Sequence, residues 1–197
     1  MWVKLCGLRS EADVDAAIAA GADAVGFVVV PSPRQVDAET VRRLVQRVAG
    51  RATTVAVFRQ VHPAALEQRA ALGVDMVQGV LDGAPLGPRV LPVLADAADL
   101  PEKVMALGAE RLLVDGPRFG SGTSADWSRV AEVARERAVI LAGGLDPDNV
   151  RTAIERVRPM GVDVSSGIES RRGIKSPDRM HAFVQAARSA VFVQERP

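Results

Sequence analysis

Two residues that can exchange protons stand at the ends of two short apolar segments. The only cysteine of the chain, Cys6, ends the segment 2–6, and a glycine follows it. Asp115 ends the segment 111–115 and is followed by a glycine in the same way. If both segments are strands whose ends face one pocket, the thiol and the carboxylate form a candidate pair of general base and general acid.

Each of these groups also has an ordinary structural explanation. A lone cysteine is usually a small buried hydrophobe, and an aspartate at a strand end often only caps a loop. Catalysis by Cys6 requires the thiolate, so a cation or a helix dipole would have to lower the thiol pKa from about 8.5. Asp115 would act as an acid near neutral pH only if burial or a neighbouring anion raised its pKa well above about 3.9.

The segments that end in these groups alternate with helical patterns. We expect strands near 2–6, 24–29, 53–58, 75–78, 89–94, 111–115, 138–142 and 161–165. We expect helices near 11–20, 37–49, 63–71, 99–107, 126–136, 147–157 and 177–191. The segment 79–88 contains glycine, proline and aspartate without a helical period, so the helix after the fourth strand should be shortened or missing.

Several helix starts are marked by capping residues. Ser10 and Asp13 have the spacing of a capping box. Asp146-Pro147 and Ser176-Pro177 each place a capping side chain before a proline, which suits the first helical turn. These signals predict helices that begin at 11, 147 and 177.

Alternating strands and helices favour an α/β fold with a parallel sheet. The runs 24–30 and 138–142 are apolar throughout, as expected for strands covered on both faces. Eight strands can close into a barrel or open into a doubly wound sheet, but the dinucleotide fingerprint is absent after the first strand. We therefore predict a single, compact (β/α)8 TIM barrel over residues 1–197, with about 25 residues per unit.

The predicted barrel gives the strand ends a common location. In such barrels the chemistry lies at the C-terminal ends of the strands, and the loops after strands seven and eight often bind phosphate. Gly143, Gly144, Ser166 and Gly167 occupy those two loops, where glycine exposes backbone N–H groups. Glycines are common in turns and by themselves indicate no ligand. Their position in these two loops predicts a phosphate site.

Composition excludes several classes of function. The net charge is +1, and two tryptophans with five phenylalanines and no tyrosine form no stacking platform, so we expect no nucleic-acid partner. One cysteine excludes an internal disulfide, and His62 and His181 lack metal-ligand spacing. No apolar run approaches the ~20 residues of a membrane span, and we expect a cytoplasmic protein without a membrane partner.

Over nearly its full length the chain resembles the phosphoribosylanthranilate isomerase family. Each matching motif is weak by itself, but the ordered set is very specific. The motifs are VKLCGL at 3–8, GADAVGF at 21–27, SPR at 32–34, LVD at 113–115, GSG at 120–122, DW at 126–127, LAGGL at 141–145, PDNV at 147–150, VDVSSGIE at 162–169 and GIK at 173–175.

The resemblance implies a barrel enzyme of tryptophan biosynthesis that needs no metal or organic cofactor. Its reaction is an Amadori rearrangement of N-(5'-phosphoribosyl)anthranilate to 1-(2-carboxyphenylamino)-1-deoxyribulose 5-phosphate. By this resemblance Cys6 is the general base and Asp115 the general acid. Arg34, otherwise a loop charge, would pair with the anthranilate carboxylate. Asp163 would contact the sugar or orient its neighbours.

The same resemblance implies that Gly143, Gly144, Ser166 and Gly167 hold the phosphate, and that residues 120–122 form a mobile loop over the site. The partner is then a small phosphosugar-anthranilate substrate, and the enzyme is a monomer or a homodimer. Two alternatives stay open at this point. One is a related cofactor-free phosphosugar enzyme with an altered substrate, and the other is a barrel that binds an anion without catalysis.

Two departures from the family pattern motivate those alternatives. The family usually has Gln-Leu-His-Gly at the end of strand four, whereas residues 77–83 read VQGVLDG. Either Asp82 stands where the family has histidine, or Gln78 keeps its place and the strand is altered. The basic residue usual near the end of strand five is missing from 91–96.

Overall fold

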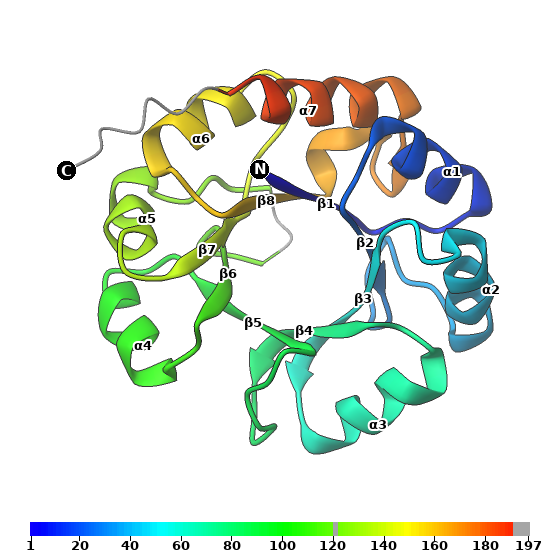
Figure 1. Cartoon of the computed structure of the whole chain (residues 1–197), viewed down its shortest axis with the longest axis horizontal. Helices are drawn as coiled ribbons and strands as arrows, with labels where there is room; N and C mark the ends of the chain where they lie inside the picture. Colours follow the sequence, from blue (N-terminus) through cyan, green and yellow to red (C-terminus); the bar gives the residue numbers. More distant parts are fainter. Residues whose placement is uncertain (120–121, 191–197) are drawn as a thin grey trace.

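The computed structural model describes residues 1–119 and 122–190, and in it eight parallel strands close into a barrel (Figure 1). The strands follow one another around the barrel, and β8 pairs with β1 to close it. They are β1 (Trp2–Cys6), β2 (Ala24–Val28), β3 (Thr53–Val61), β4 (Met76–Leu81), β5 (Val90–Ala95), β6 (Arg111–Asp115), β7 (Ala138–Leu141) and β8 (Gly161–Val164). The predicted fold class is confirmed.

Helices surround the barrel as an outer layer (Figure 1). They are α1 (Glu11–Ala20), α2 (Ala38–Val48), α3 (Pro63–Leu72), α4 (Leu100–Leu107), α5 (Trp127–Ala134), α6 (Val150–Val157) and α7 (Pro177–Ser189). Between β4 and β5, residues 82–89 contain turns and no helix, as the sequence predicts. Along the described residues, no helix combines the length and apolar character needed to cross a membrane.

The strands are buried on both faces because their side chains alternate between two apolar layers. Val3 and Leu5 of β1 face outward into the main core with the helices. Ala24 of β2 and Leu113 of β6 belong to a second cluster inside the barrel. Alternation therefore places Lys4 and Cys6 on the inner face of β1, two residues apart.

Helix starts follow local capping in two of the three predicted cases. Ser10 and Asp13 form the expected capping box, and Ser176 caps α7 before its N-terminal proline. The predicted start at 147 is wrong, because α6 begins at Val150. The carboxylate of Asp146 instead accepts the N–H groups of Asp148 and Asn149, both at 2.9 Å, and this turn delays the helix.

Strands β3 and β4 run further than predicted, to Val61 and Leu81. Their pairing shifts register after Val57 and then resumes, which the apolar pattern does not signal. This longer pair belongs to the side of the barrel that has no helix after β4.

A short hairpin follows β8 and was not predicted. It contains a 3₁₀ turn, η1 (Ser166–Ile168), and the strands β9 (Glu169–Arg171) and β10 (Ile174–Lys175). The positive φ of Gly173, 81°, permits the tight turn between the strands. The hairpin brings Lys175, paired with Glu169, against Ser165, the residue that follows β8.

Candidate active site

The predicted site residues gather at the C-terminal end of the barrel. A narrow cavity of about 50 Å³ lies there, bordered by Arg34, Asp115, Asp163 and the glycine-rich loops after β7 and β8. Larger hollows of about 490 and 820 Å³ lie along α4, α5 and α6, away from the inward-facing acid and base. The small cavity is below the ~300 Å³ typical of ligand pockets, so the bordering side chains must shift when a ligand of that size enters.

Cys6 ends β1 inside the barrel and is 6% exposed. Its backbone oxygen accepts a hydrogen bond from the hydroxyl of Ser165 at 3.1 Å. Burial raises the pKa of the thiol, Lys4 and Lys175 act in the opposite direction, and Asp163 adds to the rise. The cations that a thiolate needs are therefore present, but burial outweighs them and the pKa of the thiol is raised.

Lys4 is the main inward residue that sequence reasoning missed. It is completely buried, and its ammonium donates to Oδ1 of Asp163 at 2.9 Å. Burial acts to lower the pKa of Lys4, but the charges of Asp163 and Cys6 outweigh it, and the pKa is raised. A lysine two positions before Cys6 in an apolar strand could have signalled this inward charge.

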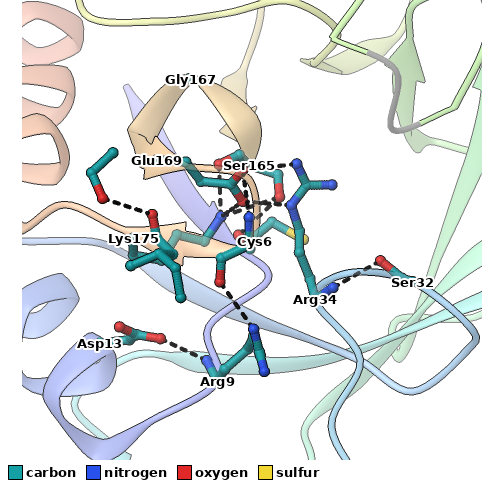
Figure 2. A network of polar contacts seen from close by, with 12 residues as sticks. Cys6, Arg9, Asp13, Ser32, Arg34, Ser165, Gly167, Glu169 and Lys175 are labelled. Carbon is teal, nitrogen blue, oxygen red and sulfur yellow. Dashed lines mark hydrogen bonds and ion pairs between the residues drawn. The ribbon is translucent and has the colours of Figure 1, made fainter.

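Arg34 lies against Gly7, the residue after Cys6, and its guanidinium is engaged within the protein (Figure 2). Nε donates to Oε1 of Glu169 at 2.6 Å, and Nη2 donates to Oε2 at 3.1 Å. The pairing with a substrate carboxylate that the resemblance implies cannot use these same donors while Glu169 holds them. Gly7 makes room for the arginine, because a Cβ there would lie 2.7 Å from Arg34 Cδ.

Lys175 completes this buried network from β10 (Figure 2). Its ammonium donates to Oε1 of Glu169 at 3.0 Å and to the backbone oxygen of Ser165 at 2.7 Å. Burial lowers the pKa of Lys175, although Glu169 partly opposes that shift. For Glu169, burial acts to raise the pKa, but hydrogen bonds from Arg34 and Gly173 outweigh it and hold the pKa below its usual value.

Asp115 ends β6 and is half-buried at the border of the cavity. Its Oδ1 accepts the N–H of Gly116 at 2.8 Å. A Cβ on Gly143 would lie 3.1 Å from the same oxygen, so the glycine lets the β7 loop approach the carboxylate. Both the acid and the base candidate therefore end strands at the same mouth of the barrel.

The predicted phosphate loops pack against each other so closely that glycine is required. Gly143 and Gly144 have φ values of 83° and 66°, in the left-handed region. A Cβ on Gly144 would lie 2.5 Å from the hydroxyl of Ser124, and one on Gly167 would lie 1.9 Å from the backbone oxygen of Leu145. In the predicted loop at 120–122, residues 120 and 121 lie outside the described residues.

The strand-four departure is resolved in favour of one alternative. Gln78 is buried on the inner face of β4, and among the described residues its Oε1 has no hydrogen-bond partner. Asp82 is exposed and pairs with Nδ1 of His62 at 3.1 Å, so it does not face the cavity. Gln78 therefore keeps the inward position, and the carboxylate does not replace a histidine there.

The end of strand five lacks the usual basic residue but carries a buried acid, Asp96, whose partners come from the start of α5. Asp96 is buried just after β5, where Oδ1 accepts from Nη1 of Arg129 at 2.5 Å. Its Oδ2 accepts the N–H of Asp126 at 2.6 Å. Asp96 thus fastens the start of α5 instead of facing a ligand.

Comparisons with known proteins agree on one family. The family model described as N-(5'phosphoribosyl)anthranilate (PRA) isomerase matches residues 3–186. The N-(5'-phosphoribosyl)anthranilate isomerase of Chromohalobacter salexigens is 44% identical, over 92% of this chain and 92% of its own length. Phosphoribosyl anthranilate isomerase from Thermotoga maritima has a TM-score of 0.83 and 32% identity, covering 95% of this chain and 98% of that one.

A further solved structure contains a ligand. It is a phosphoribosyl anthranilate isomerase in complex with reduced 1-(o-carboxyphenylamino)-1-deoxyribulose 5-phosphate. Its TM-score is 0.80 at 31% identity, with 95% of this chain and 98% of that chain covered. The similarity therefore extends over the whole barrel and is not confined to one motif.

Proposed function

We propose that this chain, which belongs to the N-(5'-phosphoribosyl)anthranilate isomerase family, uses Cys6 as its general base and Asp115 as its general acid. The enzyme converts an aldose derivative into a ketose in tryptophan biosynthesis. The observation that supports the two assignments is that a thiol and a carboxylate end β1 and β6 at one barrel mouth.

Asp115 acts first. Its carboxylic acid gives a proton to the ring oxygen of the ribose, and the bond between C1 and that oxygen breaks. The electron pair of the anthranilate nitrogen forms the C1–N double bond, so the product of this step is an open-chain iminium. The leaving oxygen departs as a hydroxyl and not as an alkoxide, which is the reason an acid is needed.

Cys6 acts second. Its thiolate removes the proton on C2, and the electrons of that bond form the C1–C2 double bond while the iminium electrons return to nitrogen. The resulting enolamine becomes the ketone when C1 gains a proton and the C2 hydroxyl loses one. Because the iminium nitrogen accepts electrons, a base of modest strength is sufficient.

The substrate anions have cationic or glycine-rich surroundings. We assign the phosphate to Gly143, Gly144, Ser166 and Gly167, because the first three line the cavity and the fourth follows Ser166 directly. We assign the anthranilate carboxylate to Arg34, through guanidinium donors other than the two that Glu169 holds. Asp163 contacts the sugar or orients its neighbours.

The remaining features follow from the same assignment. We propose one catalytic barrel domain over residues 1–197, active as a monomer or a homodimer in the cytoplasm. Its substrate is the small phosphosugar-anthranilate compound, and neither a nucleic acid nor a membrane takes part.

The test follows turnover of freshly prepared phosphoribosylanthranilate by its anthranilate fluorescence. The wild-type chain is compared with two variants. Cys6→Ser should lose ~10²–10⁴-fold in turnover, because a serine hydroxyl stays protonated and cannot remove the C2 proton. Substrate affinity should barely change. Near-normal turnover of this variant would remove Cys6 from the mechanism.

Asp115→Asn should fold and bind but fail to open the ribose ring. Asparagine keeps the shape of the side chain and donates hydrogen bonds, but it cannot deliver a proton. The thermal midpoint is measured beside turnover, because a loop cap would lose stability and keep its rate per folded molecule. A lower midpoint with unchanged turnover would overturn the catalytic assignment.

A further inference from the structure

The barrel interior contains a lysine that the proposed mechanism has not used. Lys4 has no exposed surface and is among the largest fully buried side chains of the described residues. Removing an ammonium from water is unfavourable unless partners compensate for the lost hydration. The ion pair with Asp163 supplies one such partner at 2.9 Å, but it does not explain why the lysine lies beside the only cysteine.

The position of Gly26 shows how close the ammonium and the thiol are. Gly26 pairs with Cys6 across β1 and β2. A Cβ on Gly26 would lie 2.9 Å from Sγ of Cys6 and 3.0 Å from Nζ of Lys4. Both atoms therefore surround one point and are less than about 6 Å apart, within the range where opposite charges stabilise each other.

We propose that Lys4 is a positioning residue for the thiolate of Cys6: Asp163 fixes its ammonium opposite Sγ, where the positive charge stabilises the ionised base. The inference rests on the proposed role of Cys6. Lys4 acts as a fixed cation and not as a proton carrier, because its raised pKa keeps the ammonium charged.

The charges around Sγ support this role. Lys4 of β1 and Lys175 of β10 oppose the burial that raises the thiol pKa, whereas Asp163 of β8 reinforces it. Glu169 of β9 pairs with Lys175 and also with Arg34.

The net charge of this buried cluster also favours the thiolate form of Cys6. When all the basic groups are charged, Lys4, Arg34 and Lys175 outnumber the carboxylates of Asp163 and Glu169 by one. Ionisation of Cys6 makes this buried cluster neutral.

The experiment titrates the thiol directly, through the ultraviolet absorbance of its thiolate. The chain has one cysteine and no tyrosine, so no other thiol or phenol titrates in the spectrum, and Cys6→Ser is the blank. Lys4→Met should raise the midpoint of the thiol titration by ~1–3 pH units. Asp163→Asn should lower it, because the amide oxygen of asparagine can still accept from the ammonium while the negative charge that opposes ionisation of Sγ is gone.

A double variant separates this effect from loss of folding. Lys4→Met alone leaves Asp163 buried without its counter-charge, whereas Lys4→Met with Asp163→Asn removes both charges. The double variant should fold with a midpoint still above that of the wild type, because the effect of the ammonium on the thiol exceeds that of the carboxylate. A double-variant midpoint at or below the wild-type value would overturn the proposal.

The matched control is Arg129→Met, which breaks the partly buried pair with Asp96 at the same end of the barrel. Its thiol midpoint should equal that of the wild type, and an equal rise in this control would also overturn the proposal. In turnover, Lys4→Met should lose about tenfold for each unit of midpoint shift, with little change in KM and with recovery at higher pH.

The two proposals fail in different ways. If Lys4→Met leaves the thiol midpoint unchanged while Cys6→Ser is inactive, the inference about Lys4 is wrong and Cys6 remains the base. If Cys6→Ser keeps its turnover, the proposed function of Cys6 is wrong whatever the titration shows.

Discussion

The two sides of the barrel mouth differ in how they hold polar groups. The charged side comprises the ends of β8, β1 and β2 with the hairpin β9–β10. It buries the pair Lys4–Asp163 and the group in which Glu169 pairs with both Arg34 and Lys175. Its titratable residues are Lys4, Cys6, Arg34, Asp163, Glu169 and Lys175. The plain side comprises the ends of β3 and β4, where Gln78 is uncharged and Asp82 is exposed.

The difference shows on which side of the barrel mouth this enzyme buries charged groups, which lowers stability unless they are paired. Burying charges destabilises a fold unless each is paired, so buried ion pairs are expected where chemistry requires them. The charged side surrounds the candidate base with such pairs, and each member has a partner within 3.1 Å. The plain side has no helix after β4 and departs from the family motif.

The largest contrast should come from two matched glycine substitutions. Gly26→Ala places a Cβ 2.9 Å from Sγ of Cys6, so the base and Lys4 must shift. We expect kcat to fall by ~10²-fold, since displacement of reacting groups by about 1 Å has that effect.

Gly79→Ala is the matched change on the plain side. It places a Cβ 2.8 Å from the backbone oxygen of Phe58, which is equally crowded. We expect a loss of ~1–3 kcal/mol in the free energy of unfolding and no change in kcat per folded molecule. Equal losses of kcat in both variants would show that the two sides do not differ as described.

The next largest effect should come from Arg34→Ala. We expect KM to rise roughly 10- to 150-fold, because a charge-assisted contact is worth about 1.5–3 kcal/mol. Glu169 keeps Lys175 as a partner, so the variant should fold. Lysine at this position should recover only part of the affinity, because an ammonium is not a planar fork.

The control for Arg34 is a substrate analogue in which hydrogen replaces the aromatic carboxylate. Arg34→Ala should leave the affinity for this analogue nearly unchanged. If the analogue is weakened as much as the parent substrate, Arg34 serves the fold and does not bind the carboxylate.

A smaller effect should appear in the pH dependence of Glu169→Gln. The folded-state pKa of Glu169 is below its ordinary 4.5, so its charge stabilises the fold above pH 4.5, and this stabilisation is lost as the pH falls below that value. The free energy of unfolding, measured with urea across this pH range, should therefore change less with pH for Glu169→Gln than for the wild type. Parallel curves for the two proteins would contradict the network described around Arg34.

The smallest effect should come from Asp82→Asn on the plain side. Its ion pair with His62 is about half-exposed, at 50% and 52% of the two side chains, so we expect at most ~1 kcal/mol in unfolding free energy. Turnover and KM should be unchanged. A large loss of turnover would mean that the segment 77–83 has a catalytic part that its exposed position does not explain.

The sequence by itself determined the order of the elements and the residues at their ends. Apolar runs and capping residues are local signals, so they predicted the strands, most helices and the missing helix after β4. The same local pattern put Cys6 and Asp115 at strand ends, and the barrel topology then gave those ends a common side.

Only the tertiary structure decided which groups meet. Lys4 and Asp163 are 159 positions apart, and Arg34 and Glu169 are 135 positions apart. The first pair depends on the register that closes β8 against β1. The second depends on the short hairpin β9–β10, which the sequence pattern does not predict. Local patterns describe which face a side chain takes along its own strand, but the partner across the barrel is set by closure of the whole sheet.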